Sequence, residues 1–207
     1  MSYEKLNSIS YIHPLLIVIS GPSGVGKDAT IARIKESGSS FHYAVTATTR
    51  HKRSGERDKV DYHFLSEEEF QQKVKAQHFL EWAKVYGNYY GVPKEGIKKA
   101  LEQGQDVIIK VDIQGAATIK HILPDAVFIF LMPPSTQELA NRLKQRQGQP
   151  SDEIDLRLNK AQEEIESLHL FDYVVVNHKD KLDITVSEVN AIVTAEKCRA
   201  EPRLVSL

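Results

Sequence analysis

The amino-acid sequence predicts an α/β fold in which a parallel β-sheet carries helices on both faces. Short apolar runs rich in β-branched residues, typical of strands buried on both faces, alternate with longer segments that have apolar residues at three-to-four spacing. The expected strands are 14–20, 105–113, 126–132 and 172–176, and the expected helices are 28–36, 114–121, 135–146 and 182–197. This alternation favours parallel strands joined by right-handed crossovers.

A segment of mixed character, residues 46–92, interrupts the alternation. It contains two short strand-like runs, 62–65 and 79–85, a helix that begins at Ser66, and a Gly87-Asn88 turn between aromatic-rich runs. The start of this helix carries a capping-box pattern, and a Gly-Asn pair between two strands commonly forms a hairpin turn. We expect a small α+β insert here.

A second interruption, about residues 140–168, is strongly charged and is broken by a polar stretch that contains glycine and proline. It predicts two helices joined by a polar loop. Residues 13–45 and 93–207, which include this segment, are expected to form the core.

Composition excludes several classes of protein. The 207 residues include 27 basic and 28 acidic side chains, a formal net charge of −1, which disfavours a general nucleic-acid or membrane-surface binder. One cysteine, Cys198, excludes a disulfide framework and fits a reducing compartment. The apolar stretch 15–19 is far shorter than the roughly 20 residues of a membrane span. We therefore expect a cytoplasmic protein with neither a nucleic-acid nor a membrane partner.

A glycine-rich loop leaves the first expected strand and opens the first expected helix. It fits G-x-x-x-x-G-K and comprises Gly21, Pro22, Ser23, Gly24, Val25, Gly26 and Lys27. In such a P-loop the backbone N–H groups and the helix end cradle phosphates, and the lysine reaches the outer ones. The next position, which usually holds a hydroxyl for Mg²⁺, is Asp28. A carboxylate can ligate Mg²⁺, but beside phosphates it needs a compensating cation. A plain glycine turn is the alternative.

Two arginines in the insert, Arg50 and Arg53, stand among hydroxyl side chains and precede Tyr62. Guanidinium forks and hydroxyl donors suit a phosphate monoester, which takes several convergent charge-assisted hydrogen bonds. Alone, these residues are more typical of a solvated basic loop. Beside a phosphate-binding loop they favour a second phosphate site.

The motifs that follow the P-loop are TTRxxRxGE, DYxF, EWA and GNYYG, at residues 48–56, 61–64, 81–83 and 87–91. In this order and spacing the sequence resembles the guanylate kinase family, whose members move a phosphoryl group from ATP to GMP. The resemblance extends from about residue 15 to 177. It implies a P-loop core, a nucleoside-monophosphate-binding insert at residues 46–92 and a helical lid at about residues 140–168. It further implies Mg²⁺ bound with ATP, and ATP and GMP as substrates, with dGMP as a further candidate.

The resemblance also implies which residues bind GMP. They are Thr46, Arg50, Arg53, Glu56, Tyr62, Glu81, Tyr90, Val92 and Asp112. Glu81 would accept hydrogen bonds from guanine N1–H and the exocyclic amine, and adenine presents neither donor there. The family usually has Ser or Thr where this chain has Val92. We therefore expect weaker discrimination between GMP and its analogues, with Glu81 and Thr46 reading the base.

For the ATP side, the resemblance adds Asp28, Arg142 and Asn177 to the seven loop residues. Lys27, Asp112 and the lid arginines Arg146 and Arg157 are the implied catalytic residues, and Asp28 and Asp112 are candidate Mg²⁺ ligands, directly or through water. Lid arginines would stabilise the charge on the transferred phosphoryl group and exclude water. Ordinary helix ion pairs with neighbouring acids are the alternative.

A second departure from the family lies at the end of the strand before Asp112, where an acid is typical and this chain has Lys110. We hypothesise that Lys110 and Asp28 form a compensating pair, because an unpaired buried charge is costly. A lysine whose ammonium reaches solvent is the alternative.

The residues, together with the resemblance to guanylate kinases, predict direct in-line transfer of the ATP γ-phosphoryl group to GMP. Two alternatives remain at this point. A P-loop kinase of another phosphate acceptor, such as a ribose bisphosphate, is disfavoured by Glu81 and the GNYYG run. A non-catalytic guanylate-kinase-like protein-binding domain is disfavoured by the intact P-loop.

Overall fold

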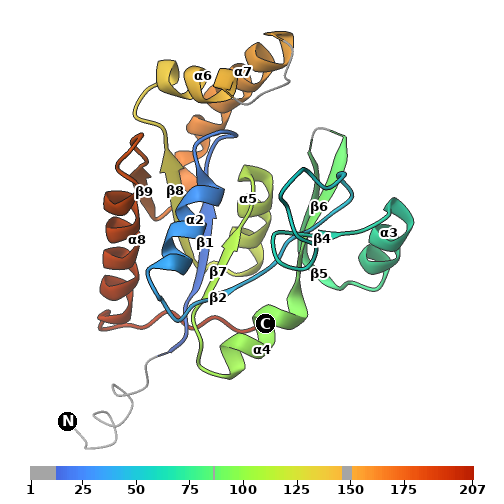
Figure 1. Cartoon of the computed structure of the whole chain (residues 1–207). Helices are drawn as coiled ribbons and strands as arrows, with labels where there is room; N and C mark the ends of the chain where they lie inside the picture. Colours follow the sequence, from blue (N-terminus) through green and yellow to red (C-terminus); the bar gives the residue numbers. More distant parts are fainter. Residues whose placement is uncertain (1–12, 86, 146–150) are drawn as a thin grey trace, which may run out of the picture.

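The computed structural model describes residues 13–85, 87–145 and 151–207, and only the backbone of 145 and 151–157. Its centre is a five-stranded parallel sheet in the order β2-β7-β1-β8-β9 (Figure 1). The strands are β1 (Leu16–Ser20), β2 (His42–Tyr43), β7 (Val107–Lys110), β8 (Val127–Met132) and β9 (Tyr173–Val176). The four longer strands lie where the apolar runs predicted them, so the α/β class is confirmed.

Helices cover both faces of this sheet. They are α4 (Lys94–Glu102) and α5 (Ile113–Ile122) on one face, and α2 (Lys27–Glu36) and α8 (Leu182–Lys197) on the other. Successive strand residues point to opposite faces. Leu16 and Val18 of β1 accordingly pack with α4 and α5, and Ile17 and Ile19 with α2 and α8. No helix in the described ranges is long and apolar enough to cross a membrane.

The expected insert forms a second, four-stranded sheet in the order β4-β3-β6-β5, beside the central sheet in Figure 1. Its elements are β3 (Ala47–Thr48), β4 (His63–Phe64), α3 (Glu67–Lys75), β5 (Phe79–Val85) and β6 (Asn88–Pro93). The predicted capping box is present, because Ser66 and Glu69 each accept a hydrogen bond from the other's backbone N–H. Phe70 of α3 stacks on Phe79 with ring centroids 4.6 Å apart, which fixes the helix to the sheet.

The charged segment forms two helices, as expected. They are α6 (Thr136–Gln145) and α7 (Ser151–Glu166), followed by the 3₁₀ turn η1 (Ser167–Leu170). Leu139 and Leu143 of α6 pack against Ala161 of α7, and Figure 1 shows the pair beyond the end of β8. The pair has a small apolar core of its own, separate from the two clusters of the central sheet.

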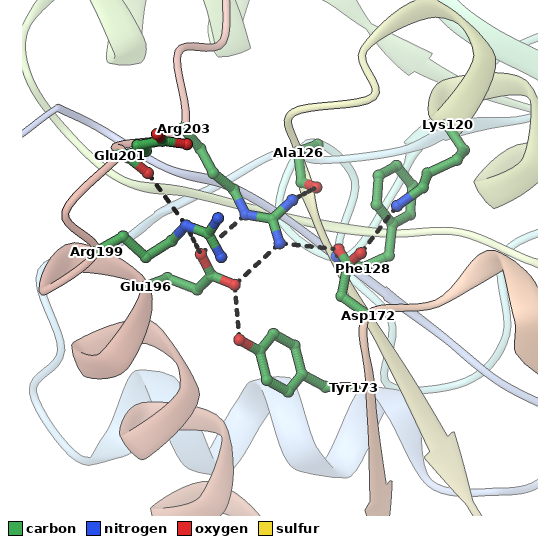
Figure 2. A network of polar contacts seen from close by, with 9 residues as sticks. All are labelled: Lys120, Ala126, Phe128, Asp172, Tyr173, Glu196, Arg199, Glu201 and Arg203. Carbon is green, nitrogen blue, oxygen red and sulfur yellow. Dashed lines mark hydrogen bonds and ion pairs between the residues drawn. The ribbon is translucent and has the colours of Figure 1, made fainter.

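The C-terminal segment, for which the sequence predicts nothing, is held to the core by polar contacts of Arg203 (Figure 2). The Arg203 guanidinium donates to both Glu196 carboxylate oxygens, at 2.9 and 3.0 Å, and lies 3.5 Å from Asp172. Glu196 also accepts a hydrogen bond from the Tyr173 hydroxyl at 2.7 Å, and its side chain has no exposed surface. The network joins the end of α8 to the start of β9.

Candidate functional site

The P-loop joins β1 to α2 along a backbone path that glycine allows. Gly21 has φ of 143°, and a Cβ there would lie 2.2 Å from a carbonyl oxygen of β8; Gly26, at φ 105°, is the N-cap of α2. Lys27 folds back, and its ammonium donates to the carbonyls of Gly21 and Pro22, the latter at 3.1 Å. Burial lowers the pKa of Lys27 to about 8, although nearby carboxylates oppose the shift. A phosphate in the loop would favour the charged form of this lysine.

Two predicted ATP-binding residues lie behind the loop. Arg142 donates to the carbonyl of Val25 at 2.9 Å and to that of Asn177 at 2.7 Å. The Asn177 amide donates to the same Val25 carbonyl at 2.7 Å, and its own carbonyl accepts from Thr185. These hydrogen bonds hold the backbone of the P-loop on the side away from the cavity. Neither residue is among the described residues that line the cavity in front of it.

Glu56 forms hydrogen bonds with two arginines that lie between β3 and β4. Both of its carboxylate oxygens accept from the Arg50 guanidinium, at 2.8 and 3.1 Å, and one also accepts from the backbone N–H of Arg53 at 2.7 Å. Burial opposes ionisation of this carboxyl, but the hydrogen bonds from the two arginines hold the pKa of Glu56 below its usual value. Glu56 therefore positions the Arg50 guanidinium and the Arg53 backbone, while both arginines line the cavity.

Glu81 on β5 presents a buried carboxylate. The residue is 5% exposed, and its Oε2 has no hydrogen-bond partner among the described residues. Burial, with a smaller contribution from the charge of Asp112, raises the pKa of Glu81 to about 8. Gly115 makes room for the group, because a Cβ there would lie 2.8 Å from Oε2. Val92 pairs with Glu81 across the β5–β6 ladder, and its side chain is fully buried in the core.

The hypothesised charge pair is present. The Lys110 ammonium lies 2.5 Å from Asp28 Oδ1 and also donates to the Tyr62 hydroxyl at 2.9 Å. The Lys110 side chain is only 18% exposed, so the alternative of a solvated lysine is wrong. Burial disfavours its charge, but Asp28 and Tyr62 outweigh this and raise the pKa of Lys110. The pair thus places the charge of Asp28 against a cation beside the P-loop.

A cavity of about 400 Å³ lies between the P-loop and the second sheet. The predicted site residues that line it are Gly21, Pro22, Ser23, Gly24, Gly26, Lys27, Asp28, Thr46, Arg50, Arg53, Tyr62, Glu81, Tyr90 and Asp112. Others lie outside this lining among the described residues, namely Val25, Glu56, Val92, Arg142 and Asn177. Arg146 falls outside the described residues, as does the side chain of Arg157. The two expected phosphate sites therefore open into one space.

Glu164 is a cavity residue that the sequence interpretation missed. It comes from α7, lines the cavity, and accepts a hydrogen bond from the backbone N–H of Ser23 in the P-loop. Burial raises the pKa of Glu164, although the charge of Lys27 opposes this. Nothing in the sequence indicated this contact, because the two residues are 141 positions apart and their approach depends on how α6 and α7 pack. By contrast, the glycine of the Gln114-Gly115 pair could have signalled the close approach of Glu81.

The two candidate metal ligands differ in their surroundings. Asp112 caps α5, with Oδ1 accepting from the Gly115 N–H at 2.8 Å, and Asp28 is held by Lys110. No cluster of three or more potential ligands occurs in the part of the chain that the structure describes. Mg²⁺ usually keeps several waters and binds through one or two carboxylates plus substrate phosphates. The donor set therefore fits a Mg²⁺ that arrives with a nucleotide.

The P-loop, the parallel sheet that ends on it and the polar cavity in front define a P-loop nucleotide-binding protein. A family model described as guanylate kinase matches residues 13–196. The chain therefore belongs to the guanylate kinase family.

Known relatives agree with this membership over most of the chain. A guanylate kinase of Caldanaerobacter subterraneus is 47% identical over 187 residues, which cover 90% of each chain. One from Halalkalibacterium halodurans is 43% identical over 187 residues, 90% of this chain and 91% of the relative. The crystal structure of guanylate kinase from Anaplasma phagocytophilum is 30% identical with a TM-score of 0.77, covering 93% of this chain and 90% of that one.

Proposed function

We propose that this protein transfers the γ-phosphoryl group of ATP to GMP and produces ADP and GDP. The observation that carries the proposal is that one cavity joins the P-loop to Glu81, a buried carboxylate whose Oε2 lacks a partner in the described part of the chain. Guanine N1–H and its exocyclic amine are two donors that would satisfy this carboxylate. The guanylate kinase names of the relatives support the same pair of substrates.

The second sheet, residues 46–92, is proposed as the GMP-binding insert. Its phosphate ligands would be the cavity-lining cations and hydroxyls Arg50, Arg53, Tyr62 and Tyr90. Glu56 supports this assignment, since it holds the Arg50 guanidinium and the Arg53 backbone without facing the cavity. Thr46, also in the lining, would assist Glu81 at the base.

The core, residues 13–45 and 93–207, would hold ATP in the P-loop, with Lys27 on the transferred group. The lid, about residues 140–168, would bring Arg146 and Arg157 over the phosphates. Glu164 occupies a loop N–H that a donor phosphate would use, so its carboxylate must leave Ser23 when ATP binds. Arg142 and Asn177 would support the ATP side by bracing the loop.

Mg²⁺ would bind with ATP and neutralise part of the phosphate charge. Asp112 is the better candidate ligand, directly or through water, because Asp28 already neutralises Lys110. The protein's own contribution is positioning and electrostatic stabilisation. The attacking GMP phosphate oxygen is already ionised, so the transfer needs no strong general base and no side-chain nucleophile.

The proposal is tested with ATP labelled at the γ-phosphate, Mg²⁺ and GMP. We expect label in GDP in equal amount to the ADP formed. Label transferred to a ribose bisphosphate but not to GMP would support the alternative P-loop kinase, and no transfer to any acceptor would support a binding domain. dGMP is included as a second acceptor. The cytoplasmic location stays a prediction, supported by the single cysteine, which is free and exposed.

A further inference from the structure

Three side chains from different parts of the chain meet at the wall of the cavity. Lys110 ends β7, Asp28 lies in the first turn of α2, and Tyr62 directly precedes β4 of the second sheet. The Lys110 ammonium lies 2.5 Å from Asp28 Oδ1, 2.9 Å from the Tyr62 hydroxyl oxygen and 4.5 Å from the Tyr62 ring centroid. One ammonium therefore connects the helix of the P-loop to the insert.

We propose that Lys110 is a positioning residue that fixes the Tyr62 hydroxyl as a hydrogen-bond donor to the phosphate of the acceptor nucleotide. An ammonium group only donates, so the Tyr62 oxygen must be the acceptor in their contact. The single hydroxyl hydrogen of Tyr62 is then left for another acceptor. Tyr62 lines the cavity, where the proposed function, on which this inference rests, places the GMP phosphate.

The same contact strengthens Tyr62 as a donor. A hydroxyl that accepts from a charged group is polarised, and linked hydrogen bonds of this kind reinforce one another in a site of low dielectric. The ring position adds to this, because an ammonium over an aromatic face is attracted to it. Lys110 would thus hold both the ring and the hydroxyl of Tyr62.

Asp28 keeps the lysine in place. The Lys110 side chain is 18% exposed and that of Asp28 is 68% exposed, so the carboxylate reaches in from the solvent side. Without it, the buried ammonium would lack its anionic partner. Asp28 follows Lys27 directly, so the arrangement sets Tyr62 relative to the loop that would hold the donor phosphates.

A charge pair that only compensates Asp28 predicts something different. In that case the Lys110 charge would act on the phosphates independently, and its removal would have the same effect with or without the Tyr62 hydroxyl. A double-mutant cycle separates the two, since residues that act through each other give non-additive effects.

The experiment measures the dissociation constant of GMP by titration calorimetry, without ATP or Mg²⁺, for the wild type, Lys110→Met, Tyr62→Phe and the double variant. We expect each single substitution to weaken GMP binding by about tenfold, the size of a lost hydrogen bond to a charged group. The double variant should be no more than about twofold weaker than Tyr62→Phe. Independent effects, close to a hundredfold in the double variant, would overturn the proposal, as would Lys110→Met with an unchanged constant.

Steady-state kinetics give a second readout. Lost binding of the acceptor phosphate should raise KM for GMP while kcat and KM for ATP change little. Lys120→Met is the matched control, because it removes an ammonium 3.0 Å from Asp172 with a similar 27% exposure, away from the cavity. It should leave GMP binding unchanged, and thermal unfolding of each variant checks the fold. A wild type that does not bind GMP refutes the proposed function, whereas wild-type binding with independent effects refutes only the role of Lys110.

Discussion

GMP binding should strengthen as the pH rises from 6.5 to 8, because the free protein holds Glu81 mostly protonated. Burial raises the pKa of this carboxyl to about 8, and the proposed contacts with guanine need the ionised form. GMP therefore binds the minority of molecules in which Glu81 is ionised, and binding is coupled to the release of the Glu81 proton. The stability of the free protein depends on pH in the opposite direction. Between the ordinary pKa of a glutamate and the raised pKa of about 8, the native state binds more protons than the unfolded state. Glu81 therefore makes the free energy of unfolding fall as the pH rises through this interval.

The magnitude follows from the ionised fraction. With a pKa of about 8, the ionised fraction of Glu81 is about 3% at pH 6.5 and about half at pH 8. An apparent dissociation constant scales inversely with the competent fraction, so the constant for GMP should fall about 15-fold over this interval. Above pH 8 the further gain is less than about twofold. The second ionisation of the GMP phosphate, near pH 6, contributes only about 1.3-fold.

Titration calorimetry from pH 6.5 to 9 measures the dissociation constant of GMP and the number of protons released on binding. In buffers of different ionisation enthalpy at pH 6.5, GMP binding should release about one proton. Glu81→Gln is the control: it should bind GMP more weakly and retain only the small slope of the phosphate. A wild-type constant that is flat between pH 6.5 and 8, or the same slope in the Gln variant, would refute the role of Glu81.

Three further predictions concern the loop, the base site and the C-terminal network. Lys27→Met should lower kcat by at least about a hundredfold while circular dichroism shows an intact fold, and near-normal turnover would contradict its assignment. Val92→Ser should increase the preference for GMP over IMP and AMP in kcat/KM. An unchanged preference would contradict the hypothesis that Val92 weakens the discrimination between GMP and its analogues. Arg203→Met removes two hydrogen bonds to the buried Glu196 and leaves its carboxylate with the Tyr173 hydroxyl and the more distant Arg199. We expect a loss of about 3 kcal/mol, so Tm should fall by about 10 °C. Arg199→Met, whose partly exposed guanidinium lies 3.6 Å from the same carboxylate, should change Tm by less than about 3 °C, and equal effects would contradict the argument.

Sequence patterning predicted the core well, since strands buried on both faces leave long apolar runs. It missed β2, whose two residues, His42 and Tyr43, are too few for a periodic signal. It also missed α4, although Ile97, Ala100 and Leu101 stand at the three-to-four spacing of an amphipathic helix and pack on the core. A strand as short as β2 forms only through packing on the rest of the fold, whereas α4 was predictable from its sequence pattern.

The site was predictable where a motif or a charge balance constrains it. The P-loop conformation follows from its glycines, and Lys110 beside Asp28 follows from the cost of an uncompensated charge. The contact of Glu164 with the P-loop and the contact of Arg142 with the Val25 carbonyl were not predictable, because both depend on how α6 and α7 pack on the core.

The most direct test of the proposed activity compares GMP with AMP as acceptors at fixed ATP and Mg²⁺. Glu81, buried and short of a partner at Oε2 among the described residues, should reject a base that lacks the two guanine donors. We predict a kcat/KM for GMP that exceeds that for AMP by at least about a hundredfold, with GDP as the product. Equal values for the two nucleotides, or ADP formation that does not depend on GMP, would contradict the assignment.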